Sequence, residues 1–176
     1  MNIFILDLDP FLAAQSLCDP HVRKMGIESV QLLCTAHRVL DGQEYTGVTK
    51  TGRKIKRWAL PNHLAGIYEA THVNHGCAKW VRESWYNYQW LYCHSLEIFR
   101  IWTAKRNKIH KCETILKSLP GPPKNIPDVG WTRPYLAMPD EYKVPIDCVR
   151  SYQNLYLGGK RHLAQWTYNK KPDWYN

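Results

Sequence analysis

The sequence of 176 residues contains no apolar run long enough to cross a membrane. Its opening segment, residues 2–8, is apolar but too short and too acidic for a secretory signal peptide. The sequence shows no internal repeat and no low-complexity segment. We therefore expect a cytoplasmic protein with one domain, spanning residues 1–176, because a chain of this length can build a single hydrophobic core.

A CxxC pair is also missing, although the chain has six cysteines. Without a secretory signal, scattered cysteines are more typical of reduced core thiols than of a disulfide framework. Three short clusters combine cysteine with histidine: Cys18 with His21, Cys34 with His37, and His72 with His75 and Cys77. None has the partner spacing of a zinc site, so we expect no metal, and no pattern indicates a cofactor.

Phenylalanine is scarce (3), whereas tryptophan (8) and tyrosine (11) are abundant. Aromatic rings with a polar edge suit stacking surfaces and half-buried clefts. Acidic residues are outnumbered by basic ones, 15 to 24, which gives a net charge of +9. This charge favours a partner that carries phosphate, such as DNA or a free nucleotide, although a merely soluble basic protein would share it.

The apolar periodicity predicts a mainly α fold, a single-domain helical bundle. Three long helices are expected over about 20–40, 77–106 and 145–166, and they should pack together. Asp-Pro steps favour helix starts, and the first of them predicts a short helix over 10–17. The apolar opening, residues 2–8, could form a strand.

Two segments between these helices carry other patterns. Residues 44–58 alternate loosely around Thr51-Gly52, which predicts a hairpin. Its second half is basic, which fits either phosphate binding or a solvated loop. Residues 119–145 are proline-rich yet hold several large apolar side chains. We expect this segment to be a long ordered wrap over the helices.

The first long helix places several polar residues within one narrow arc: His21, Lys24, Glu28, Gln31 and Thr35. Apolar residues border the arc, which indicates either a pocket or a solvated face with incidental charge pairs. For a pocket, desolvation would favour the neutral, nucleophilic amine of Lys24. Glu28 could then shuttle protons and His21 could act as a second acid or base. These three candidate catalytic residues would support cleavage of an N-glycosidic bond through a Schiff base.

The same region could instead only bind a nucleotide. Lys24 and Arg82 would then hold phosphate, and Glu28 would hold a sugar hydroxyl. Polar Asn87 and His94 interrupt the aromatic seam of the second long helix and are expected to face the arc. Seven residues are candidates for binding a nucleotide. Gln31 and Asn87 would hydrogen-bond the edge of the base, and Arg82 would bind phosphate. Asn74 and His75 come from a polar loop, and the rings of Trp90 and Trp174 would stack on the base.

Several blocks resemble a family of small proteins carried by tailed bacteriophages: Met1-Asn2-Ile3-Phe4, Cys18-Asp19-x-His21-Val22-x-Lys24-Met25-x-x-Glu28, Thr71-His72-x-Asn74-His75, Trp80-x-Arg82-Glu83-Ser84, and Ala137-Met138-Pro139-Asp140-Glu141-Tyr142-Lys143. The resemblance covers nearly the whole chain. It implies expression in the cytoplasm of an infected bacterium and no particular reaction.

The layout of a helix with a carboxylate, an aromatic helix, a third helix and a closing Pro-x-Trp-Tyr is similar to the pyrimidine-dimer DNA glycosylases and lyases of T-even phages. This likeness implies that Glu28 is the catalytic glutamate and that Trp174 and Tyr175 touch DNA. The chain departs from the pattern at Ile27 and Gln31, which stand where those enzymes have arginines. Their nucleophile is the amine of a small residue exposed by removal of Met1, whereas Asn2 is bulky.

Three classes of function therefore remain open. A glycosylase or lyase that acts on DNA comes first. The second is a counter-defence protein that binds, sequesters or degrades a nucleotide immune signal. The third is an inhibitor that binds another protein, since basic surfaces also meet acidic protein partners.

Overall fold

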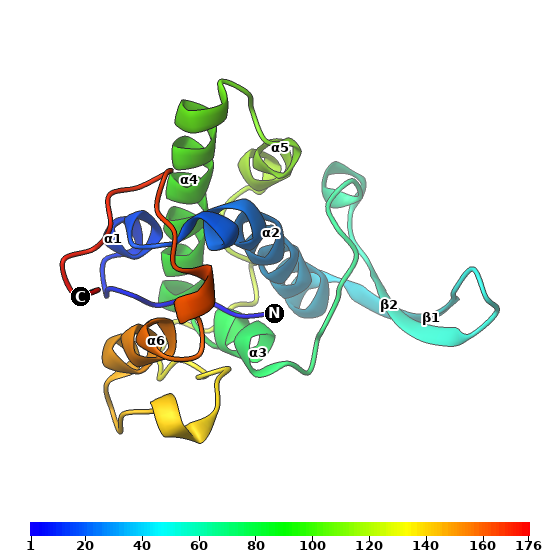
Figure 1. Cartoon of the computed structure of the whole chain (residues 1–176). Coiled ribbons are helices and arrows are strands. Elements are labelled where there is room, and N and C mark those ends of the chain that lie inside the picture. Colours follow the sequence, from blue (N-terminus) through cyan, green and yellow to red (C-terminus); the bar gives the residue numbers. More distant parts are fainter.

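The computed structural model describes residues 1–176 and is mainly α-helical (Figure 1). Its helices are α1 (Pro10–Gln15), α2 (Asp19–Asp41), α3 (Gly76–Glu83), α4 (Trp85–Arg106), α5 (Lys111–Ser118) and α6 (Cys148–Leu157). Strands β1 (Gln43–Val48) and β2 (Lys54–Ala59) pair as an antiparallel hairpin. Short 3-10 turns occupy Asn62–Leu64, Asp140–Tyr142 and Arg161–Leu163. None of the helices has the length and apolar character that a membrane crossing requires.

Helix α2 confirms the predicted first long helix, and α1 confirms the short helix before it. Asp9 caps α1 by accepting hydrogen bonds from the amides of Phe11 and Leu12. Asp19 does not cap α2, because the cap position falls on Cys18. Instead, its buried carboxylate accepts hydrogen bonds from Thr167 N and Oγ1, each at 2.7 Å, and so fastens the C-terminal segment to α2.

The second predicted long helix is wrong because it is two helices. Ser84 has extended backbone angles (φ −152°, ψ 147°) and its hydroxyl accepts a hydrogen bond from Tyr86 N, which starts α4. The third predicted long helix, over about 145–166, is also wrong beyond residue 157. Helix α6 ends before Gly158, and the ring of Tyr142 packs against both Gly158 and Gly159, where side chains would collide with it.

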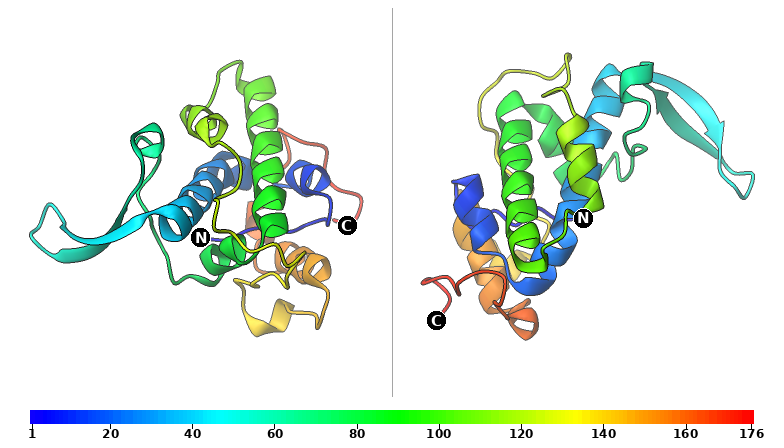
Figure 2. Two further views of the ribbon diagram at one scale, coloured as in Figure 1. Left: turned by 180° about the vertical axis from the view of Figure 1, so that it is seen from behind. Right: turned by 90° about the horizontal axis from the view of Figure 1, so that it is seen from above.

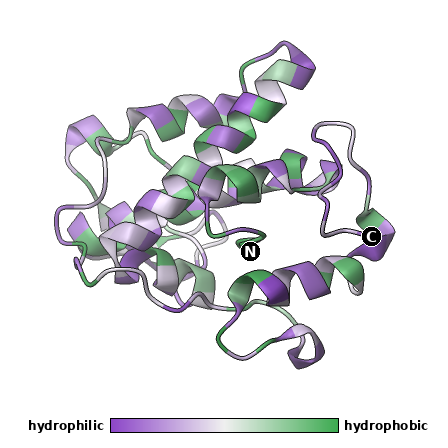
Figure 3. Cartoon of the chain, turned by 90° about the vertical axis from the view of Figure 1, so that its left-hand side faces the viewer, coloured by the Kyte–Doolittle hydropathy of each residue, from purple (hydrophilic) through white to green (hydrophobic).

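Helices α2 and α4 pack across each other at the centre of the molecule, with α1 against α4 and α3 against α2 (Figure 2). At the crossing, a Cβ on Gly26 would lie only 2.7 Å from Phe99 Cε1, so the glycine permits the close approach. Colouring by hydropathy shows that the helices carry both hydrophobic residues, in green, and hydrophilic residues, in purple (Figure 3).

Two irregular segments complete the core. Residues 3–6 are almost fully buried but pair with no strand, so the strand expected over 2–8 is wrong. Residues 119–145 contain no α-helix or strand and lie partly against the core, as the proline-rich pattern predicts. Asn87 fixes this segment to α4: its side chain accepts a hydrogen bond from Thr132 N at 3.2 Å and donates to Thr132 Oγ1 at 2.6 Å.

Candidate functional site

A concavity of about 130 Å³ opens beside the first turns of α2. We call it the Glu28 pocket, and it is lined by Met1, Asn2, Phe4, His21, Lys24, Met25, Glu28 and Lys160. Three segments distant in sequence form it: the N-terminal residues, α2, and the turn after α6. The pocket therefore contains all three candidate catalytic residues.

Glu28 lies between three groups of this pocket, Lys24, Asn2 and the N-terminus. Its side chain is 14% exposed, and its Oε1 lies 3.0 Å from Lys24 Nζ. Its Oε2 accepts a hydrogen bond from Asn2 N at 3.2 Å and lies 4.0 Å from the α-ammonium of Met1. A half-buried carboxylate is thus held between two amines, of which Lys24 is in direct contact with it.

Lys24 is located differently from what the desolvation hypothesis requires. Its side chain is 70% exposed, so burial does not deprive the amine of water. The expectation of a desolvated lysine is therefore wrong. Its ammonium instead pairs with the Glu28 carboxylate at 3.0 Å.

His21 is buried and neutral. Its ring stacks on Phe4 at 4.1 Å between centroids, and its Nδ1 shares a short hydrogen bond with the Tyr156 hydroxyl. Burial, together with the nearby charges of Lys160 and Lys24, lowers the pKa of His21 to about 3. Such an imidazole does not supply a proton at neutral pH, so we assign it a positioning role in place of the expected acid or base role.

His75 lies close enough to the pocket to be affected by its charges. Its Nδ1 accepts a hydrogen bond from Cys77 N at 3.2 Å and thereby caps α3. Burial lowers the pKa of His75, the α-ammonium of Met1 lowers it further, and Glu28 opposes the shift. The neighbouring Asn74 is exposed, and neither Asn74 nor His75 lines the Glu28 pocket.

The residues expected from the second long helix do not reach the pocket. Arg82 donates to Ala78 O at 3.0 Å on its own helix, and Asn87 is fully buried and bonded to Trp80 O at 2.8 Å. Trp90 donates to Leu8 O at 2.7 Å and stacks on His94, both inside the core. The prediction that these side chains face Lys24 and Glu28 is wrong, because residues 1–4 and α6 occupy that face of α2.

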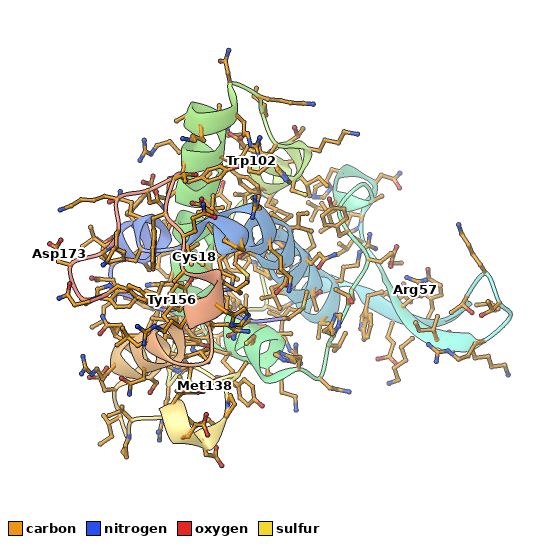
Figure 4. All side chains as sticks on the ribbon, viewed as in Figure 1. Cys18, Arg57, Trp102, Met138, Tyr156 and Asp173 are labelled. Atoms are coloured by element: carbon orange, nitrogen blue, oxygen red, sulfur yellow. The ribbon has the colours of Figure 1, made fainter.

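Two further candidates lie at the margin. Gln31 is half-buried on α2, three residues after Glu28. Trp174 packs edge-on against Tyr156 at 5.9 Å between centroids. Figure 4 shows Tyr156 near Cys18 in the middle of the molecule, and Cys18 Sγ lies 4.0 Å from the Tyr156 hydroxyl. Trp174 therefore supports the buried side of the His21 environment and also lines a shallower cleft of about 640 Å³.

Comparisons with other proteins leave the site to be interpreted from its own geometry. No family model, curated protein or solved structure matches the chain.

Reasoning from sequence missed four residues that build the Glu28 pocket or hold its walls: Asn2, Tyr152, Tyr156 and Lys160. The Tyr152 hydroxyl donates to Asn2 Oδ1 at 2.8 Å, and Asn2 Nδ2 donates to Ala137 O at 3.0 Å. These contacts join residues more than 130 positions apart, so no local pattern could reveal them.

The cysteine and histidine clusters form no larger group. All six cysteines are free, as expected of reduced thiols. His37 Nε2 bonds to the Tyr88 hydroxyl at 2.9 Å, so it serves the core. No group of three or more histidine, cysteine, aspartate or glutamate side chains is arranged to hold a metal ion.

Proposed function

We propose that the chain is a single-domain helical bundle that acts on DNA and cleaves an N-glycosidic bond with glycosylase or lyase chemistry. The observation that carries this proposal is the pairing of Lys24 Nζ with the half-buried carboxylate of Glu28 at 3.0 Å. An amine attacks a sugar carbon only when it has lost a proton, and a positioned carboxylate is a suitable acceptor for that proton.

The reaction would use these two groups in sequence. Lys24 passes one proton to Glu28, and its lone pair forms a bond to the sugar C1′ while the bond from C1′ to the base breaks. The base leaves with the bonding electron pair and takes the proton held by Glu28. A second proton moves from the new C1′–N ammonium to O4′, which opens the sugar ring and leaves a protonated Schiff base. Water then adds to C1′ of the Schiff base, the C1′–N bond breaks with its electron pair going to nitrogen, and the sugar aldehyde and the amine of Lys24 are released.

The size of the Glu28 pocket favours a polymeric substrate. Sites that enclose a small ligand occupy about 300–1,000 Å³, whereas this one measures about 130 Å³. It can admit part of a sugar and a phosphate oxygen but not a whole nucleotide. The groups that would have read a base and stacked on it, Asn87 and Trp90, are buried elsewhere. Both observations support a reacting edge of DNA over a sequestered free nucleotide.

Borohydride trapping on duplexes with an abasic site or a pyrimidine dimer tests the proposal. Reduction of the Schiff base should leave a covalent adduct of protein and DNA, and Lys24→Ala should abolish it. Lys117→Ala is a matched control, because Lys117 also pairs with a carboxylate one helical turn away, Glu113, at 2.6 Å. This control should trap as well as the wild type.

Other outcomes contradict the proposal in distinguishable ways. An adduct that persists in Lys24→Ala and maps to Met1 by peptide mass would overturn the role of Lys24. Absence of an adduct together with submicromolar uptake of a free nucleotide would favour the sequestering counter-defence protein. Absence of both would favour the protein-binding inhibitor.

A further inference from the structure

The hairpin of residues 43–59, which we call the basic arm, stands away from the helices in every view (Figures 1 and 2). Its two strands pair only with each other. A two-stranded ribbon is marginally stable in water by itself. Its order must therefore come from how its base and its tip are held.

The base of the basic arm is fixed by the buried side chain of Arg38 on α2. Its guanidinium donates to Trp58 O at 2.7 Å, to Ile67 O at 2.9 Å and to Tyr68 O at 3.0 Å. Gly42 makes the junction tight, since a Cβ there would lie 2.9 Å from Trp58 Cβ. The arm consequently has a defined direction relative to α2 and the Glu28 pocket.

The tip is held by its own backbone. Thr49 N donates to Arg53 O at 2.9 Å, and Arg53 N donates to Thr49 Oγ1 at 3.0 Å. Gly52 has a positive φ of 81°, a conformation that glycine adopts without strain. The turn is thus pre-organised before any partner arrives, which lowers the entropy cost of binding.

The charge of the basic arm is strongly one-sided. It contains five lysine and arginine residues and one glutamate, so it supplies +4 of the net +9 of the chain. Lys56 pairs with Glu44 at 2.9 Å, and Arg57 pairs with Glu69 at 3.4 Å. The cations at the tip have no carboxylate within 4.0 Å and are exposed: Lys50, Arg53 and Lys54.

Exposed apolar side chains accompany these cations. Tyr45 is 49% exposed and Val48 is 63% exposed. In the antiparallel register Val48 lies opposite Lys54, and Tyr45 lies opposite Arg57, which Figure 4 shows projecting from the arm. The face with Val48 therefore offers an unpaired cation for phosphate next to an apolar group for a sugar, whereas on the face with Tyr45 the cation is paired with Glu69.

The dimensions of the basic arm match duplex DNA. A two-stranded ribbon fits the major groove, which is about 12 Å wide. The stretch of α2 from Glu28 to Asp41 spans about 20 Å, and a strand of this length spans about 20 Å more. The tip is then up to about 40 Å from the pocket, which corresponds to roughly twelve base pairs at 3.4 Å each.

We propose that the basic arm binds the phosphates of duplex DNA about one helical turn from the nucleotide held at the Glu28 pocket. The position of one turn rests on the proposed function, whereas the binding of duplex by the arm does not. Arm and pocket together would require a duplex longer than about ten base pairs for full affinity.

Binding to an undamaged duplex of about 24 base pairs, measured from 50 to 200 mM salt, tests the arm without any chemistry. Removing three phosphate contacts should reduce the slope of log affinity against log salt by about 2.7. For the triple variant Lys50→Ser, Arg53→Ser, Lys54→Ser, the ratio of wild-type to variant affinity should fall about 40-fold over this range.

A matched control removes the same charge from the other end of the molecule. The triple variant Lys105→Ser, Lys108→Ser, Lys111→Ser changes three exposed cations near the junction of α4 and α5. It should keep the wild-type slope. Equal slopes for all three proteins, equal losses in both variants, or no binding of duplex by the wild type would each overturn the arm proposal. Duplex binding that depends on the arm, without any trapped adduct, would overturn only the glycosylase.

Discussion

Glu28→Gln is expected to slow release of the base by about 10²–10⁴-fold while duplex affinity changes by less than about threefold. The amide keeps the shape of the side chain and can still accept the hydrogen bond from Asn2 N. It cannot take a proton from Lys24, so the amine stays protonated and does not attack. The ion pair that is lost joins residues one helical turn apart, and such pairs contribute only about 0.3–0.5 kcal/mol to stability, so the variant should fold.

Single-turnover rates of base release from a dimer-containing duplex, beside equilibrium binding to the same duplex, separate these effects. Glu113→Gln serves as the control, because Glu113 also pairs with a lysine one turn along its helix. It should release the base at the wild-type rate. A normal rate for Glu28→Gln would remove the carboxylate from the proposed mechanism.

The protein should lose stability steeply in acid, by at least about 2.7 kcal/mol for each pH unit below about 6. Burial lowers the pKa of both His21 and His94 to about 3, from an unfolded value of 6.5. The unfolded chain therefore binds at least two protons that the folded chain excludes, because burial also lowers the pKa of His37, His75 and His110, and falling pH favours unfolding. The stability that these histidines give is complete above pH 6.5 and disappears as the pH approaches 3.

Urea unfolding at several pH values between 7 and 4 measures this slope. His94→Leu should reduce it by about 1.4 kcal/mol per pH unit, the contribution of one proton. It should also keep or raise stability at pH 7, because both ring nitrogens of His94 are buried without a hydrogen-bond partner. His63→Gln changes an exposed histidine and should leave the slope unchanged. A wild-type stability that is flat down to pH 4 would contradict the prediction.

The sequence predicted helix ends correctly where the residues at those ends determine them. The steps Asp19-Pro20 and Asp41-Gly42 predicted α2 within one residue at each end, because proline and glycine restrict or free the backbone at that position. The break at Ser84 was missed since the apolar periodicity continues through it. A serine followed by aromatic residues was a usable cap signal there. The short helix α5 was missed as well.

The candidate site was likewise predicted where local sequence determines it and mispredicted where distant segments do. His21, Lys24 and Glu28 share one face of α2 by helical geometry alone, and the structure places all three at one pocket. The residues opposite them were mispredicted, because what faces a helix depends on chain segments far away in sequence. Asn87 and His94 were predicted to line the pocket because they are polar residues within an apolar seam. Asn87 instead hydrogen-bonds Thr132 and so holds the proline-rich segment, and both ring nitrogens of His94 are buried in the core without a hydrogen-bond partner.

The threading of residues 2–6 through the centre of the molecule has a consequence for the order of events on the ribosome. Asn2 finds its partners at Ala137 and Tyr152, and Phe4 packs edge-on against Tyr156. These residues are synthesised first, but they cannot form their native contacts until the last quarter of the chain has left the ribosome. Closing such long loops is slow. We therefore expect the Glu28 pocket to form late in synthesis, after the α2–α4 crossing is already in place.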